Sequence, residues 1–534
     1  MSGASSLLPG VAVLAAFIGF VITALVLLAM AGGGVTSIPF DRLFGSYSRS
    51  ILAFTLTQTT LSVALSLLGA LPVAVVLHRY ASFPGHAALV RLLALPLALP
   101  PLVAVLGLLD VWGRAGLVGA FLNLIGLDVR PNIFGLHGVV LAHVFFNLPL
   151  TARLMLSHLE RQPATTFRLA DQLGLAGWSR FWRVEWPLLR DQFPGIAALV
   201  VMLCIGSFTI VLTLGGGPSS ATFEVAIYQA LRFDFDPPLA VLYTLVQLAL
   251  ALVILGLLRL SGRASEDRAG GELQTCGYAR TLPLWAVFIL VLLLGLLVAP
   301  LAALVIAGLG ADWLRLLGTE RLWSAILTSF VIALSAGTLA TLSAYLVLVA
   351  KLRGFEGLQS PHVFRHFFNT GYSALGSAVL VVPPIVLVAG WFLALRGWPA
   401  QSIIAGGLVV LVNALMALPF VLRVLGPAFE AAERRYGPLR RSLHLTGWPV
   451  LLRMDLPVLA RPFLVAVLFA FVLSVGDLGA AVLFGAYDLV TLPVLILSLM
   501  GSYRTGDAVG VALLLGLFVF ALMALAERIH KVMA

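Results

Sequence analysis

Lysine is nearly absent from this sequence of 534 residues. Only two lysines occur, Lys351 after Ala350 and Lys531 after His530. A P-loop that binds ATP needs Gly-Lys followed by Ser or Thr, because the lysine reaches the phosphates. Neither lysine follows a glycine. The chain therefore has no conventional ATP-binding loop, and a process driven by ATP would need another subunit to hydrolyse it.

Cysteine and charged residues are also scarce. The two cysteines, Cys204 and Cys276, support neither a disulfide framework nor a metal site. Charged residues make up 10% of the chain and hydrophobic residues 61%, with a mean hydropathy of +1.06. This composition excludes an ordinary soluble protein. The net charge of +10 lies in short loops between apolar runs, so membrane topology explains it and we expect no nucleic-acid partner.

Apolar runs recur along the whole chain. A transmembrane helix needs about 20 apolar residues, and roughly a dozen runs approach that length. They lie at residues 6–30, 51–77, 89–111, 133–156, 194–214 and 238–258, and then at 284–309, 323–349, 373–395, 402–424, 462–484 and 508–526. A polar, glycine-rich linker at 261–282 separates the two series. We predict an all-α polytopic membrane protein with about 12 transmembrane helices, in a first half at 1–260 and a second half at 283–534.

The two halves share a polar segment at a constant spacing of 270 residues. Residues 148–187 align with residues 418–457 without a gap. The matches include Gly177-Trp178 with Gly447-Trp448, Glu185 with Asp455, and Pro187 with Pro457. An internal repeat constrains the whole fold. Because each half holds an even number of spans, the halves have the same orientation and would be related by a pseudo-two-fold axis along the membrane normal.

The charged parts of this repeat indicate the orientation of the chain. We call them the first polar loop (residues 157–190) and the second polar loop (residues 425–460). If both loops, the linker and both termini face the cytoplasm, most of the 33 Lys and Arg residues lie on that side. Membrane insertion selects such an excess of basic residues on the cytoplasmic side. We therefore predict that both polar loops are cytoplasmic.

The first polar loop has a sequence that suits a docking surface. Helix formers follow Pro163, and Gly174 and Gly177 suit a left-handed stop and turn. The apolar side chains nearby would be too many to leave in water without a partner: Leu173, Leu175, Trp178 and Phe181. The alternative is a helix on the membrane surface with its arginines on lipid phosphates. The duplication favours a two-fold symmetric partner.

The repeated loop resembles the EAA coupling loop of ABC-importer permeases. That pattern is Glu-Ala-Ala, three residues, Gly, nine residues, then Ile, one residue and Leu-Pro. Gly174 takes the Gly position, whereas His444 stands there in the second loop. The other matches are Val184 and Trp186-Pro187 in the first loop and Met454 and Leu456-Pro457 in the second. The name-giving triplet is degenerate in both copies, as Arg168-Leu169-Ala170 and Pro438-Leu439-Arg440.

Further phrases narrow this resemblance to the thiamine ABC-importer permeases of proteobacteria, whose two halves are fused. They lie at residues 141–150, 214–236, 474–479 and 501–508. The resemblance implies a type I ABC importer permease fold in the bacterial inner membrane, with both termini cytoplasmic, among membrane lipids. It implies no enzymatic activity and no cofactor in this chain. Its partners would be a homodimer of ATPase subunits that bind ATP-Mg and a periplasmic binding protein that delivers thiamine or its phosphate esters.

Two alternatives stay open. Relatives that move ferric iron share the fused plan, so ferric iron or another small solute is an alternative substrate. An alternative of another class is a twelve-span secondary transporter, which would normally rely on several ionisable groups inside the membrane. Within its predicted spans this sequence offers essentially Asp477 alone. A membrane enzyme would need a constellation of His, Asp or Cys at one face, and none emerges.

The resemblance assigns ATPase coupling to residues of both polar loops. They are Ala170, Leu173, Gly174, Gly177, Trp178, Pro187, Leu443, His444, Gly447, Trp448 and Pro457. Glycine adopts a positive φ freely, whereas a residue with a Cβ does so at a cost of roughly 1 kcal/mol or more. We therefore expect the two ATPase contacts to be unequal, with the first loop tolerating fewer changes at this position than the second. On this hypothesis Gly174→His uncouples ATP hydrolysis from uptake, while His444→Gly is nearly silent.

Four acidic residues are candidates for other roles. Asp477 could line the translocation pathway and attract a cation, or it could belong to a kinked, internally hydrogen-bonded site beside Ser474. Glu224, Asp234 and Asp236 fall on the periplasmic side of the predicted topology. These three could meet basic residues of the binding protein, or they could belong to a solvated loop.

Overall fold

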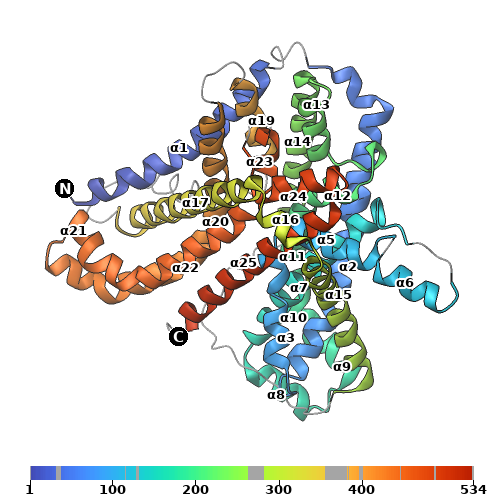
Figure 1. Ribbon diagram of the computed structural model, residues 1–534. Coiled ribbons are helices and arrows are strands. Elements are labelled where there is room, and N and C mark those ends of the chain that lie inside the picture. Colours follow the sequence, from blue (N-terminus) through green and yellow to red (C-terminus); the bar gives the residue numbers. More distant parts are fainter. Residues whose placement is uncertain are drawn as a thin grey trace. The chain divides into compact units, whose positions relative to one another are not determined.

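The computed structural model describes residues 2–31, 38–114, 116–127, 131–261, 282–354, 382, 384–395, 401–445, 447–485 and 489–531 (Figure 1). Helices dominate these segments, and none of them contains a β-strand. Nearly all of the predicted linker and the first part of the predicted span at 373–395 lie outside the described residues, as does Cys276. The all-α prediction is confirmed.

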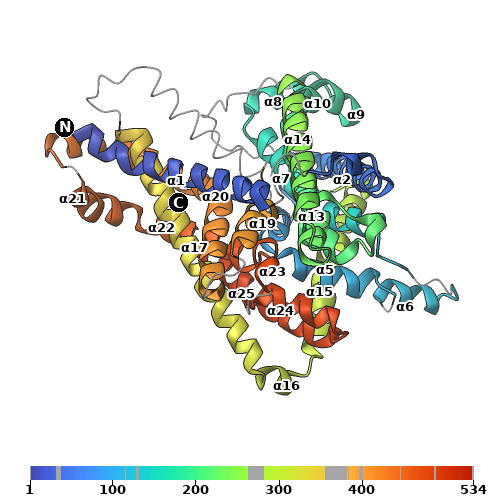
Figure 2. The same ribbon diagram turned by 90° about the horizontal axis from the view of Figure 1, so that it is seen from above.

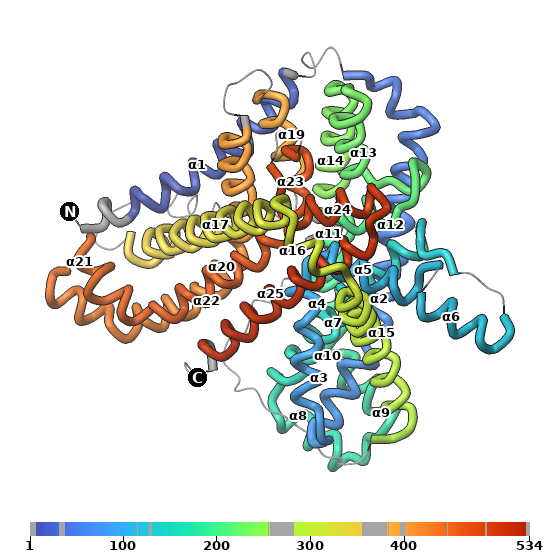
Figure 3. The backbone as a smooth tube through the Cα atoms, in the orientation of Figure 1, coloured from blue at the N-terminus to red at the C-terminus, as the bar shows by residue number. Residues whose placement is uncertain are grey.

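The chain forms two compact units, and each is described by itself. Unit 1 comprises Met1–Phe40, Ile227–Thr244 and Gly310–Ala534, and unit 2 comprises Asp41–Ala226 and Leu245–Leu309. These units cross the predicted boundary between the sequence halves. The first helix of the first half, α1 (Ser2–Ala31), belongs to unit 1, whereas the first helix of the second half, α15 (Leu284–Leu309), belongs to unit 2. Figure 3 traces the course of the backbone.

Unit 2 is built around the pair α2 (Ser46–Arg79) and α7 (Leu136–Glu160), which pack along each other, while α5 (Pro101–Trp112) packs on α15. Its other helices and turns are η2 (Phe40–Phe44), α3 (His86–Leu92), α4 (Leu95–Ala98), α6 (Leu117–Leu124), α8 (Ala164–Gln172), α9 (Gly177–Arg180), η3 (Phe181–Glu185), α10 (Trp186–Arg190), α11 (Phe193–Ile205), α12 (Phe208–Leu214) and η4 (Pro218–Ser220). Helices α13 (Phe223–Arg232) and α14 (Pro237–Ser261) each have residues in both units.

Unit 1 is built around α17 (Glu320–Arg353), which packs on α1, α20 (Gln401–Ser442) and α22 (Leu456–Val475), as Figure 2 shows. Its other helices and turns are α16 (Trp313–Leu317), α19 (Pro384–Ala394), α21 (Trp448–Val450), η5 (Leu451–Asp455), α23 (Gly479–Phe484), α24 (Leu492–Gly501) and α25 (Thr505–Lys531). Helices α2 and α17 have the same length of 34 residues and both end in arginine.

Two glycines let the exchanged first helices approach closely. In unit 2 a Cβ on Gly107 of α5 would overlap the carbonyl oxygen of Pro300 in α15. In unit 1 a Cβ on Gly390 of α19 would overlap the carbonyl oxygen of Ala24 in α1. Only glycine permits such contacts between helix backbones, which are typical of helix pairs in membranes. Each half therefore receives the first helix of the other half through an equivalent contact.

Ten described helices are long and apolar enough to cross a membrane, or eleven if the pair formed by residues 177–190 and 193–205, bent by 60°, counts as one span.

The predicted span at 89–111 is not one helix. It is divided into α3, α4 and α5, because the prolines at 96, 100 and 101 remove backbone donors and restrict the residues before them. The span predicted at 194–214 is likewise divided, at Gly206 and Ser207.

Candidate functional site

Both polar loops lead from the end of one long helix to the start of another. In the first loop α7 ends, and α8, α9, the π-helical turn η3 and α10 follow as separate pieces. In the second loop α20 runs without a break through the part that corresponds to α7 and α8, although it contains Pro419, Pro427 and Pro438. The turns α21 and η5 and the helix α22 follow. The π-helical turns η3 and η5 lie at the spacing of the sequence repeat.

The turn after α8 has the same geometry as the turn after α20. Gly174 has a φ of 66° and His444 a φ of 50°. In each loop this residue donates its N–H to the carbonyl oxygen three residues earlier, and the next N–H reaches the carbonyl oxygen five residues earlier. The backbone reason for expecting a difference between the loops is therefore removed, because histidine adopts the left-handed conformation here. The second left-handed position is glycine in both loops, with φ of 53° at Gly177 and 66° at Gly447.

A buried carboxylate ends the π-helical turn in each loop. Glu185 is 0% exposed and Asp455 is 1% exposed. The guanidinium of Arg79, at the end of α2, donates to both carboxylate oxygens of Glu185, at 2.7 and 2.6 Å. Arg353, at the end of α17, donates to both oxygens of Asp455, at 2.8 Å each. A bidentate pair fixes direction as well as distance, so each loop is held rigidly to the end of a long helix.

The charges around these two pairs come from different positions in the two loops. In the first loop Arg180 bridges Asp171, at 2.6 Å, and the carboxylate of η3, at 3.4 Å. In the second loop Glu433 binds both the arginine at the end of α17, at 2.6 Å, and Arg440, at 3.1 Å. The residue that corresponds to Arg180 is Val450. The central pair is thus repeated, whereas its supporting contacts are not.

Each loop exposes two leucines at the end of its helix. Leu169 and Leu173 are 56% and 67% exposed, and Leu439 and Leu443 are 54% and 58% exposed. In each pair the residues are four apart, so they share one face. Ala170, which the sequence placed in the same coupling surface, is buried and packs inward. An exposed apolar pair on a short helical face suits a groove on another protein.

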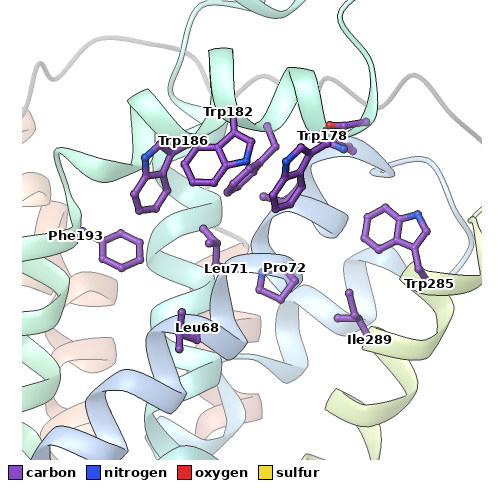
Figure 4. Close-up of a pocket in the computed structure, with 13 residues that line it drawn as sticks. Leu68, Leu71, Pro72, Trp178, Trp182, Trp186, Phe193, Trp285 and Ile289 are labelled. Atoms are coloured by element: carbon purple, nitrogen blue, oxygen red, sulfur yellow. Dashed lines mark hydrogen bonds between the residues drawn. The ribbon is translucent and has the colours of Figure 1, made fainter.

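The aromatic residues of the first loop form a separate feature, which we call the aromatic pocket (Figure 4). It has a volume of about 650 Å³. The centroids of the Trp182 and Trp186 rings are 5.7 Å apart, and the Trp178 ring stacks on Phe181 at 5.5 Å. The rest of the lining comes from Gly177 and Phe193, from α2 at Leu68, Leu71, Pro72, Val75 and Arg79, and from α15 at Trp285 and Ile289. Trp178 therefore lines this pocket together with residues of two long helices.

Asp477 has a structural partner. It lies between α22 and α23, and its Oδ2 accepts a hydrogen bond from the N–H of Ala480 at 2.9 Å. This contact satisfies an amide at the start of α23, as a capping carboxylate does. It fits the hydrogen-bonded alternative for Asp477, while a role in the pathway stays a prediction.

The three other acidic candidates differ in exposure. Glu224 is fully buried and accepts a hydrogen bond from Gln247 at 3.3 Å. A buried carboxylate offers no surface to a binding protein, so the structure contradicts that role for Glu224. Asp236 accepts a hydrogen bond from the N–H of Leu239 at 3.1 Å near the start of α14. Asp234 is exposed, and its contact with a binding protein stays a prediction.

His143 and Asn413 lie at the repeat spacing and each shares a hydrogen bond with a serine, although the two serines do not correspond to each other in the repeat. In unit 2 His143 of α7 shares a 2.7 Å hydrogen bond with Ser207. In unit 1 Asn413 of α20 donates to the hydroxyl of Ser474 at 2.8 Å. His143 and Asn413 thus join helices α7 and α20 to neighbouring segments of the same unit. Within the described part of the chain no group of three or more His, Cys, Asp or Glu side chains could hold a metal ion.

The two arginines that hold the loops were not predicted from the sequence. Arg79 and Arg353 lie 106 and 102 residues before the carboxylates that they bind. The available signal was an arginine at the end of a long apolar run in both halves, combined with the match of Glu185 to Asp455. The structure joins these two observations into one repeated contact.

No protein family model matches the chain. It is, however, similar to curated transport proteins over nearly its whole length. The thiamine transport system permease protein ThiP of Brucella abortus (strain 2308) is 44% identical over 520 residues, which cover 97% of this chain and 93% of the relative. ThiP of Escherichia coli (strain K12) is 40% identical over 491 residues, covering 91% and 89%. ThiP of Haemophilus influenzae is 34% identical over 481 residues, covering 89% and 88%.

The chain carries two copies of one loop, each held to the end of a long apolar helix and each exposing a leucine pair. Together with the similarity to ThiP proteins, these features define a fused two-half permease of the ABC-importer class. Such a chain is a multi-pass transport subunit of the inner membrane. It belongs to the thiamine transport system permease family, the ThiP family.

The buried ion pairs predict which charge removals destabilise the chain. Removing one partner of such a pair costs about 3–5 kcal/mol, because the other charge stays buried without a counter-ion. We expect Glu185→Gln and Asp455→Asn each to lower the melting temperature of the purified chain in detergent. Arg453→Gln, which alters an exposed arginine of η5, is the control. The double variant Arg79→Met/Glu185→Met should recover most of the loss. Single variants that melt like the control would contradict the assignment.

The shared turn geometry predicts small and opposite effects at Gly174 and His444. A Cβ at Gly174 would meet no heavy atom within 4 Å, so only backbone strain of roughly 1 kcal/mol separates the two residues. We expect Gly174→His to destabilise slightly, His444→Gly to stabilise slightly, and both to keep thiamine uptake. Thermal unfolding and uptake at matched membrane abundance would test this. If Gly174→His abolished uptake while the chain stayed abundant, backbone conformation would not be what the position requires.

Proposed function

We propose that this chain is the permease through which thiamine passes from a periplasmic binding protein to the cytoplasm. The observation that carries the proposal is the 44% identity to a thiamine transport system permease over 97% of the chain. The same substrate name recurs in relatives from three further genera, at 34% to 40% identity. Thiamine phosphate esters are included in the proposal, since they share the cationic thiazolium.

The energy for transport would come from a homodimer of separate ATPase subunits that bind ATP-Mg. Two features of the sequence support this part of the proposal. The two lysines of the chain lack the Gly-Lys context of a P-loop. The polar loops are two copies of one surface, which suits two copies of one partner. The excess of basic residues around both loops favours placing them, and both termini, in the cytoplasm.

We derive the coupling path from the contacts of the loops. The exposed leucine pairs would sit in a groove on each ATPase subunit. Movement of an ATPase subunit would then displace η3 or η5, whose carboxylates are bonded to Arg79 and Arg353. Because each bond is bidentate, the displacement passes to the ends of α2 and α17 and is not lost in side-chain rotation. Rigid-body motion of long helices is an ordinary way to switch between two states.

Deletion of the gene in its host tests the substrate. We expect the deletion to abolish high-affinity uptake of radiolabelled thiamine, and the full-length chain supplied from a plasmid to restore it. An excess of unlabelled thiamine monophosphate should compete if phosphate esters are also carried. Unchanged thiamine uptake together with a lost response to ferric iron would replace thiamine by the alternative substrate.

The leucine pairs predict where the ATPase binds. Leu173→Asp and Leu443→Asp place a charge in each proposed contact, and the loss of a central apolar anchor costs at least about 2 kcal/mol, or roughly 30-fold in affinity. We expect both variants to lose co-purification with the ATPase and thiamine uptake, at normal abundance in the membrane. Leu314→Asp, in α16 and 91% exposed, is the matched control. If the ATPase still co-purified with both loop variants, the leucines would rest on the membrane surface instead.

A further inference from the structure

The aromatic pocket is lined almost entirely by apolar side chains. Its one charged lining residue, Arg79, is already engaged, since its guanidinium binds both oxygens of Glu185 and the carbonyl oxygen of Gly177 at 2.9 Å. A ligand inside the pocket would therefore find no free charged group on these walls. The volume of about 650 Å³ falls in the range of roughly 300–1,000 Å³ that is usual for small-molecule sites. The chemistry that fits is a hydrocarbon chain.

Two walls of the pocket belong to helices that cross the membrane. Leu68 of α2 is 66% exposed, and Trp285 of α15 is 46% exposed. Both helices are apolar enough to span a bilayer. Exposed apolar side chains on such helices face lipid, so an acyl chain can reach the pocket without leaving the membrane. Figure 4 shows that Leu68 and Ile289 lie on the helix side of the pocket and that the three tryptophans of the loop lie on its other side.

The tryptophans give the pocket an end that suits a lipid headgroup. Indole rings favour the level of the headgroups, because they combine an apolar face with a polar N–H. The residue after Trp182 is Arg183, which is exposed. Arg190, four residues after Trp186, is 62% exposed and has only a loose contact of 3.6 Å with Asp191. Both arginines are close to the tryptophans in the sequence, and a basic side chain at the level of the headgroups attracts a phosphate.

The second polar loop does not repeat this chemistry. At the repeat spacing Trp182 and Trp186 correspond to Leu452 and Leu456. The buried ion pair and the left-handed turns are retained there, as described above. The tryptophans are therefore not required by the loop fold itself, and they need another explanation.

We propose that the aromatic pocket binds one acyl chain of an anionic phospholipid, with the lipid phosphate held by Arg183. The chain lies between α2 and α15, against the rings of Trp182 and Trp186. The lipid fills the space behind the first polar loop and so supports its attachment to α2. Leu452 and Leu456 stand in place of the two tryptophans in the second polar loop, so we expect one such lipid per chain.

Native mass spectrometry of the purified chain tests the proposal, with phosphatidylglycerol and phosphatidylcholine of identical chains added to delipidated protein in detergent. We expect one phosphatidylglycerol to bind more tightly than all others. Trp182→Leu/Trp186→Leu, which copies the second loop, should weaken this binding by about tenfold or more, because indole area is lost from the contact. Trp182→Phe/Trp186→Phe should retain most of it. Trp323→Leu, at a tryptophan of α17 that is 55% exposed, is the control and should change nothing.

A second arm separates the acyl chain from the phosphate. Arg183→Gln should remove the preference for phosphatidylglycerol over phosphatidylcholine while leaving binding of the chain, and inorganic phosphate alone should not compete. Phosphatidylglycerol with brominated acyl chains should quench tryptophan fluorescence in the wild-type chain and much less in Trp182→Leu/Trp186→Leu. The proposal would be overturned if that double variant retained as much lipid as the wild type, provided that the two melt at the same temperature without lipid. Competition by phosphate alone would also overturn it.

Discussion

The bidentate pairs Arg79–Glu185 and Arg353–Asp455 are the contacts on which the geometry of both polar loops depends. Burying two charges is expensive, and their attraction offsets that expense only when the geometry is good. Both pairs use two parallel hydrogen bonds between 2.6 and 2.8 Å. A shift of either loop by one residue would break both bonds at once and leave an unpaired charge in the interior. The pairs therefore select one position of each loop relative to the end of its helix.

The repeat shows what the two loops have in common physically. The turn is formed by Gly174 in one loop and by His444 in the other, at a difference of roughly 1 kcal/mol. That is small beside the several kcal/mol at stake in a broken buried pair. Arg180 contacts the central carboxylate in the first loop, whereas Arg440 contacts Glu433 in the second. The turn residue and the supporting charges differ between the loops, whereas the central ion pair is repeated.

Much of this arrangement could be predicted from the sequence, because it is local or periodic. The long helices follow from the lengths of the apolar runs, and the paired turns follow from Gly177 and Gly447 at the constant spacing. Contacts between distant segments could not be predicted. Arg79 and Glu185 are 106 residues apart, and nothing in the local pattern links them. The burial of Glu224 could not be predicted from the sequence for the same reason, since its partner Gln247 lies on another helix.

The exchange of first helices is a further contact of this kind, and it changes how the repeat should be understood. Gly107 contacts α15 and Gly390 contacts α1, so neither half can complete its own helix packing without a helix of the other half. Because only glycine permits these backbone contacts, a substitution at Gly107 or Gly390 would disturb the packing of both halves. The halves differ outside these contacts, for example at the position of Trp182 and Leu452. Divergence there gives one loop an aromatic pocket while both loops keep the same attachment to their helices.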